Sequence, residues 1–119
     1  MQKNLLKIAT ILPYKENYTI KKAAAASLWV YDFFRHSSLR KNNYIFGSTD
    51  ANDFLSNNYI NITIKNLSSK LTSTTNQYCN ELIKKIHGKR FDIVEIHNRP
   101  LVFNILKKKL NSNFIIYFH

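Results

Sequence analysis

Hydrophobic residues along this chain of 119 residues form two kinds of pattern that alternate. Short runs rich in β-branched and aromatic residues predict strands, whereas apolar residues three or four positions apart predict amphipathic helices. Strands are predicted at residues 5–12, 44–47, 59–64, 91–97 and 114–118. Helices are predicted at residues 19–36, 77–88 and 101–110.

This alternation predicts an α/β fold with a Rossmann-like, mostly parallel sheet of five strands. Right-handed crossovers on both sides of the first strand predict the order 3-2-1-4-5, numbered along the chain. Residues 59–64 alternate between apolar and polar, which is typical of a strand near a sheet edge. No helix follows the last predicted strand. We therefore expect its apolar face to be exposed, and residues 1–119 to form one domain that is incomplete at its C-terminal end.

Local signals predict where the helices begin and end. Thr19 or a neighbouring residue is the expected N-cap of the first helix, and Asn98 is the expected N-cap of the third. Gly88 is the expected C-cap of the second helix. The lysines at 107–109 are expected in the last turn of the third helix, where they complement its dipole. One short helical turn is predicted at residues 53–55, within a polar loop.

The chain is strongly basic, with 18 Lys and Arg against 7 Asp and Glu and a formal net charge of +11. Such a charge suggests a nucleic acid or an anionic membrane surface as partner. The chain is also rich in Asn, Lys and Ile, the residues that AT-rich codons favour, so codon bias is an equally good explanation of the lysines. Basic residues of the second half cluster near predicted helix ends, at 84–90 and 107–109. This clustering can create a basic face, although it matches no nucleic-acid-binding motif.

The single cysteine, Cys79, excludes a disulfide within the chain and is expected in the core. No apolar run is long enough to span a bilayer. The N-terminal residues lack the hydrophobic region and cleavage site of a signal peptide. These observations predict a cytoplasmic protein.

Candidate functional residues follow three of the predicted strands, because ligands of open α/β sheets bind at the carboxyl ends of the strands. Lys21 and Lys22 lie in the segment after the first strand. Arg99, at a predicted helix N-terminus, suggests binding of phosphate or carboxylate. His97 and His119 end neighbouring strands, although each histidine alone is more often structural. Asn98 and Arg99 likewise have a simpler interpretation, as a helix cap and a surface residue.

Several common sites are absent from the sequence. It contains neither GxGxxG nor GxxxxGK[ST], which argues against a dinucleotide site and a P-loop. The histidines and the cysteine lack metal-ligand spacing, so no metal is expected. There is no nucleophile elbow for Ser-His-Asp chemistry.

Four stretches together resemble a known family. They are KIATILP at 7–13, KAAAASLWV at 22–30, DIVEIHNRP at 92–100 and IIYFH at 115–119. In this order they resemble the N-terminal domain of GT-B glycosyltransferases of family 4 (group 1). The resemblance covers the whole chain, and its most specific parts are DIVEIHNRP and the histidine that closes the next strand. The glycine pair that the family often carries after its first strand is replaced here within Ala23–Ala26.

The resemblance implies the N-terminal half of a GT-B fold, in which two Rossmann-like domains face a cleft. The N-terminal domain would bind a saccharide or lipid-linked acceptor, as in cell-envelope polysaccharide or lipopolysaccharide synthesis. The C-terminal domain would bind the nucleotide sugar, and transfer would retain the anomeric configuration without a metal or another cofactor. The present chain is expected to be inactive without that second domain. Its expected location is cytoplasmic, with peripheral contact at the inner face of an anionic membrane.

The resemblance also implies roles for individual residues. His119 matches a histidine that lies near the reacting sugar, and it is the candidate catalytic residue. The candidate substrate-binding residues are His97, Asn98, Arg99, Lys21, Lys22 and Ala24.

Two alternatives to a transferase remain at this point. The chain could be a non-catalytic basic α/β module that binds nucleic acid or an anionic surface. If the chain is part of a transferase, we expect no nucleic acid among its partners. A response-regulator-like module is a weaker alternative, because the first strand lacks the acidic pair that such sites need.

Overall fold

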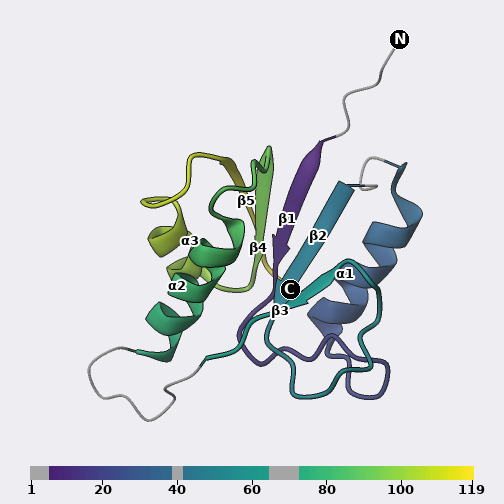
Figure 1. The fold of residues 1–119 in the computed structure, drawn as a ribbon. Helices are drawn as coiled ribbons and strands as arrows, with labels where there is room; N and C mark the ends of the chain where they lie inside the picture. The colour runs from purple at the N-terminus through teal and green to yellow at the C-terminus, as the bar shows by residue number, and fades with distance from the viewer. Residues whose placement is uncertain (1–5, 39–41, 65–72) are drawn as a thin grey trace.

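The computed structural model describes residues 6–38, 42–64 and 73–119. Within them, strands and helices alternate much as the hydrophobic pattern predicts (Figure 1). The elements are β1 (Lys7–Ile11), α1 (Ala25–His36), β2 (Asn42–Gly47), β3 (Tyr59–Asn61), α2 (Thr74–Ile86), β4 (Ile93–His97), α3 (Pro100–Leu106) and β5 (Asn113–Tyr117). Residue 5, the predicted start of the first strand, lies outside the described residues.

The five strands form one sheet in the order β3-β2-β1-β4-β5, and every neighbouring pair is parallel. The predicted α/β class and strand order are therefore confirmed. β1 lies at the centre, where Ile11 is paired with Phe46 of β2 and with Ile96 of β4. Because all strands are parallel, their carboxyl ends share one edge of the sheet, which we call the carboxyl edge. We call the opposite edge the amino edge.

Helices cover both faces of the sheet, as a parallel sheet requires (Figure 1). On one face, buried residues of α2 and α3 such as Leu82 and Leu106 pack against Val94 and Ile96 of β4. On the other face, Ala26 and Val30 of α1 belong to a second cluster, together with Ile45 of β2. Side chains of a strand alternate between the two faces. Each strand therefore presents one set of side chains to α1 and the other set to α2 and α3.

A buried tyrosine ties α2 to the central strand. The Tyr78 hydroxyl donates a 2.7 Å hydrogen bond to the Leu12 carbonyl oxygen, just beyond the end of β1. Tyr78 is completely buried, and this burial raises the pKa of its phenol well above the ordinary value. The phenol therefore stays a donor at neutral pH. Cys79, beside it, is a buried core residue as predicted, and burial raises the pKa of its thiol to about 11.

The start of the first helix differs from the prediction. α1 begins at Ala25 and not near Thr19, and Ala24 is its N-cap without a side-chain cap hydrogen bond. Thr19 instead forms an isolated antiparallel bridge with Phe54. The predicted helical turn at residues 53–55 is also wrong, because this segment is extended where it pairs with the segment before α1. The Leu55 N–H donates to the Tyr18 carbonyl oxygen, which is a second contact between the two segments.

The third helix is shorter than predicted and has a different cap. α3 ends at Leu106, so the lysines at 107–109 follow the helix instead of forming its last turn. Asn98 is not the N-cap. It has a φ of 57°, and Arg99 occupies the N-cap position without a side-chain cap hydrogen bond. The end of α2 agrees closely with the sequence, since Gly88 follows the C-cap residue His87 with a φ of 86°.

The outer strand β5 is only partly covered. Ile115 is 39% exposed and Phe118, just after the strand, is 72% exposed. Ile115 is paired with Glu95 of β4 and lies on the face that carries α1. The expected exposed apolar surface at the last strand is therefore present. Among the described residues, no helix has the length and apolar character that crossing a membrane would require.

We predict that Tyr78→Phe destabilises the protein by about 1–3 kcal/mol, because it leaves the buried Leu12 carbonyl oxygen without its donor. Chemical denaturation followed by circular dichroism measures the loss. Tyr14→Phe is the matched control, since Tyr14 packs against the same core and the described part of the structure shows no hydrogen bond from its hydroxyl. Equal losses in both variants would contradict this role of the hydrogen bond.

We also predict that the chain self-associates through β5, since an exposed apolar edge strand is a template for pairing with another chain. Ile115→Lys should reduce the association seen by light scattering at high protein concentration. Leu101→Lys changes a residue of α3 that is 56% exposed, and it serves as the control. A wild-type chain that stays monomeric at high concentration would show the prediction to be wrong.

Candidate functional site

Two histidines meet at the carboxyl edge. His97 is the last residue of β4, and His119 follows β5 by two residues. Nδ1 of His97 and Nε2 of His119 are 2.7 Å apart, which is hydrogen-bond distance. His97 is completely buried, whereas His119 is exposed. A ligand at this edge therefore reaches His119 directly and His97 only through it.

The hydrogen bond between the rings has a chemical consequence for His119. A neutral imidazole has one N–H donor and one acceptor nitrogen. When one ring nitrogen of His119 is held by His97, the role of its other nitrogen is determined as well. The tautomers of the two neutral rings are thus coupled, because one nitrogen of the pair must donate and the other must accept.

The turn after β4 holds His119 in place. The Asn98 N–H donates to the Tyr117 carbonyl oxygen at 2.8 Å, which extends the pairing of β4 and β5 by one step. The Asn98 side-chain oxygen then accepts a 2.7 Å hydrogen bond from the backbone N–H of His119. The guanidinium of Arg99 donates to the Asn98 carbonyl oxygen at 3.1 Å. Hydrogen bonds therefore connect His97, Asn98, Arg99 and His119 at this edge.

Trp29 of α1 supports the histidine pair from one face of the sheet. Its ring centroid lies 5.5 Å from that of His97, 5.3 Å from Tyr117 and 5.2 Å from His119. His97 in turn stacks on Tyr117 and on His119, with both centroid distances 5.0 Å. Aromatic pairs at these separations stabilise one another beyond simple burial. Four rings from α1, β4 and the end of β5 therefore form one rigid cluster.

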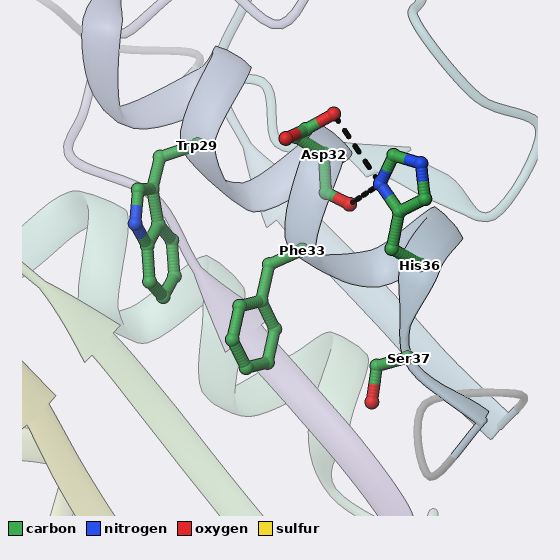
Figure 2. Close-up of a pocket in the computed structure, with 5 residues that line it drawn as sticks. All are labelled: Trp29, Asp32, Phe33, His36 and Ser37. Atoms are coloured by element: carbon green, nitrogen blue, oxygen red, sulfur yellow. Dashed lines mark hydrogen bonds and ion pairs between the residues drawn. The ribbon is translucent and has the colours of Figure 1, made fainter.

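A hollow of about 240 Å³ adjoins this cluster on the α1 face. It is lined by Trp29, Asp32, Phe33, His36 and Ser37. Figure 2 shows that the rings of Trp29 and Phe33 lie side by side, and their centroids are 4.9 Å apart. Nδ1 of His36 lies 3.0 Å from the Asp32 carbonyl oxygen and 3.5 Å from its carboxylate. Trp29 is thus common to the aromatic cluster and to a hollow with both apolar and polar walls.

The other candidate residues lie in the segment before α1. The Lys21 N–H donates to the Asp53 carboxylate, and the Lys22 N–H donates to the Thr19 hydroxyl. Both lysines are exposed, and Ala24 is half-buried at the start of α1. The described part of the structure shows no hydrogen bond from these three residues to the histidine pair. The segment that holds them connects the carboxyl end of β1 to α1, so it begins at the carboxyl edge.

The structure adds two residues that the sequence did not single out as functional. Trp29 was predicted only as one apolar residue of a helix, and Tyr117 only as part of a strand. Trp29 is the single tryptophan and lies four residues before Phe33, so both rings project from the same side of α1. This aromatic pair at positions i and i+4 was the sequence signal that could have identified Trp29 as a candidate functional residue. No local signal links Trp29 to His97, which is 68 positions away.

The site contains no set of metal ligands. Among the described residues, no group of three or more His, Cys, Asp or Glu side chains is placed to hold a metal ion. The groups available at this edge are an exposed imidazole, an exposed guanidinium and an aromatic wall. Together these groups can exchange a proton, hold an anion or a hydroxyl, and pack against the apolar face of a ring.

The chain was compared with known proteins in three ways. No family model, no curated protein and no solved structure matches it.

We predict that His119→Ala lowers the free energy of unfolding by less than about 1 kcal/mol, because the side chain is exposed. Trp29→Ala should cost about 2–3 kcal/mol, since it removes the packing against the other three rings. Urea denaturation of the two variants gives this comparison. If His119→Ala costs as much as Trp29→Ala, the exposed histidine is a structural residue.

Proposed function

We propose that this chain is the N-terminal, acceptor-binding part of a retaining glycosyltransferase that takes its sugar from a nucleotide-sugar donor. One observation carries the proposal. The histidine that closes β5 is exposed at the carboxyl edge and is oriented by a buried histidine and by Asn98. This is the edge at which open α/β sheets bind ligands. The strand order of the sheet and the DIVEIHNRP stretch support the same proposal.

The proposed chemistry assigns His119 a contact at the reacting centre. In retaining transfer, the bond between the anomeric carbon and the leaving phosphate oxygen breaks. A bond from the acceptor hydroxyl oxygen to that carbon forms on the same face. The hydroxyl proton leaves with the phosphate oxygen, so atoms and charge balance. A positioned imidazole can hydrogen-bond the acceptor hydroxyl or the leaving phosphate in the transition state.

The surroundings of His119 suit a saccharide acceptor. Arg99 is exposed next to the pair and carries a forked cation for hydroxyl or anionic groups of the acceptor. Phe33, which stacks on Trp29, is 41% exposed and provides apolar surface for the C–H face of a sugar ring. Pockets that combine aromatic walls with a few polar groups are typical of small-molecule sites. Lys21, Lys22 and Ala24 would contact more distant parts of the acceptor.

The donor site belongs to a second domain in this proposal. The nucleotide sugar is a substrate, and its main contacts would come from a C-terminal Rossmann-like domain that faces the carboxyl edge across a cleft. No resident cofactor is needed, because the leaving phosphate can be stabilised by donors of the two domains. The acceptor would be a saccharide or a lipid-linked saccharide used in building the cell envelope.

The main alternative is a non-catalytic basic module that binds nucleic acid. The charge of +11 favours it, but it gives no reason for an oriented histidine pair at the carboxyl edge. The two functions differ in their response to salt. Binding to nucleic-acid phosphates weakens steeply as salt rises, whereas binding of a neutral oligosaccharide does not.

We predict that the chain binds acceptor oligosaccharides and that Arg99→Ala weakens this binding by about 10-fold, because a charged hydrogen-bond donor is lost. Saturation-transfer NMR with a panel of oligosaccharides, at low and high salt, measures the affinity. Lys84→Ala is the matched control. It removes the same charge from an exposed side chain whose ammonium pairs with Glu81 on α2. The proposal fails if no oligosaccharide binds, or if salt abolishes the binding.

A further inference from the structure

The hollow beside Trp29, which we call the α1 hollow, extends along α1 away from the carboxyl edge. It is lined by Trp29, Asp32, Phe33, His36 and Ser37. The ring centroid of Trp29 lies 5.2 Å from that of His119 and 4.9 Å from that of Phe33. Phe33 is four residues after Trp29, or about 6 Å farther along the helix axis. The α1 hollow therefore lies where a chain-like ligand bound at His119 would continue along the helix.

Three polar groups of the α1 hollow have no hydrogen-bond partner among the described residues. They are Oδ2 of Asp32, Nε2 of His36 and the hydroxyl of Ser37. The Arg35 guanidinium donates to Oδ1 of Asp32 at 3.2 Å, which orients the carboxylate and leaves its second oxygen available. Figure 2 shows that Asp32 and His36 project from neighbouring turns of α1.

The hydrogen bond of His36 determines what its other ring nitrogen can do. Nδ1 of His36 lies 3.0 Å from the Asp32 carbonyl oxygen, and a carbonyl oxygen can only accept. Nδ1 therefore carries the proton, and in the neutral ring Nε2 is an acceptor. Oδ2 of Asp32 is a second acceptor, and the Ser37 hydroxyl can donate or accept. This set of groups suits a ligand with several hydroxyl groups.

The aromatic wall supplies the other half of a sugar-binding site. The rings of Trp29 and Phe33 are nearly parallel, with an angle of 14° between their planes, and Phe33 is 41% exposed. The face of an aromatic ring carries partial negative charge, which attracts the C–H hydrogens of one face of a sugar ring. A sugar ring packed against Phe33 can therefore bring the hydroxyls at its edge to the polar groups of the α1 hollow.

Other classes of ligand suit the α1 hollow less well. Asp32 and Arg35 form an ion pair, and a phosphate or carboxylate ligand would meet the like charge of the Asp32 carboxylate. An apolar side chain from a second copy of the protein would bury Oδ2 of Asp32 and Nε2 of His36 without partners, which is costly. A neutral ligand rich in hydroxyl groups avoids both costs.

We propose that the α1 hollow is a second sugar subsite and that the acceptor is an oligosaccharide of at least two units. The terminal unit binds at His119 and Arg99, and the unit before it packs against Phe33. This inference rests on the proposed function, to which it adds the length of the acceptor. The volume of about 240 Å³ suits one sugar unit, since sites for drug-sized molecules have roughly 300–1,000 Å³.

Saccharides of one and two units test the proposal. The probes are the methyl glycosides of glucose, galactose, mannose and N-acetylglucosamine, each compared with its disaccharide by saturation-transfer NMR. The best-binding disaccharide should bind about 10-fold more tightly than its monosaccharide, because one aromatic contact contributes up to about this factor. Phe33→Ala and Phe33→Leu should both remove this gain, since neither side chain has a ring. The affinity for the monosaccharide should change less than about twofold.

A charged acceptor and two controls complete the set of variants. Asp32→Asn should reduce the gain about threefold, because a neutral acceptor replaces a charged one. Leu28→Ala is the control for Phe33, since Leu28 is 50% exposed on the same helix and lies outside the α1 hollow. Glu81→Gln is the control for Asp32, because it removes the carboxylate of a similar ion pair on α2. Both controls should keep the full gain, and circular dichroism checks that every variant folds.

The possible failures differ in what they overturn. If monosaccharides bind through Arg99 and no disaccharide binds more tightly, the second subsite is wrong and the proposed function stands. A gain that survives in both Phe33 variants, or one that Leu28→Ala removes equally, has the same meaning. A gain that requires Phe33 while binding ignores Arg99 supports the subsite and contradicts the acceptor site at His119. If no saccharide binds, both proposals are overturned.

Discussion

The parallel pairing of β4 with β5 determines the geometry of the whole carboxyl edge. The register places His97 opposite Tyr117, so the residue that follows β4 and the residues that follow β5 must leave the sheet side by side. Asn98 turns the chain away with a left-handed φ of 57°. In that conformation its N–H still reaches Tyr117 and its side chain reaches His119. Asn tolerates this region of φ and ψ better than other residues with a β-carbon, which explains why it serves at this position.

A buried polar network underlies the aromatic cluster on the α1 face. The Thr10 hydroxyl donates to the Glu95 carboxylate at 3.0 Å, and the Asn43 amide donates to Thr10 at 2.9 Å. These side chains belong to β1, β4 and β2, so the network crosses the three central strands. Glu95 is only 2% exposed and lies two residues before His97, on the same face of β4. Hydrogen bonding offsets the cost of burying polar groups there, and it favours this one strand register over its neighbours.

The sequence predicts the sheet well because the relevant signals are local or topological. Runs such as residues 93–97 are apolar enough to identify a buried strand, and the handedness of crossovers then restricts the order of strands. The same rule predicts that His97 and His119 meet, since it requires only that their strands be neighbours. The side chains that orient the two histidines could not be predicted in this way. Trp29 reaches the pair from α1, and no short stretch of sequence contains both Trp29 and His97.

The errors at the helix ends have the same physical origin. Thr19 looks like a helix cap when only its neighbours are considered, but a bridge to Phe54, 35 positions later, holds it in extended conformation. Asn98 also looks like a cap, until the pairing of two distant strands draws its N–H and side chain towards Tyr117 and His119. Asn98 itself makes the long-range hydrogen bonds, whereas Thr19 is held by those of its neighbours, Tyr18 with Leu55 and Ile20 with Asp53. Such residues have several local conformations of similar energy, so tertiary contacts decide among them.

The direction of the helices relates the two ends of the molecule. Each helix connects the carboxyl end of one strand to the amino end of another, so the C-termini of α2 and α3 point to the amino edge. Cations after these helices are favourable there, and this preference contributes to the concentration of lysines at that edge. The candidate site lies at the other edge, where the helices begin and present free backbone N–H groups. The fold therefore keeps a cationic surface and an oriented histidine pair on opposite sides of one sheet, where each can change without disturbing the other.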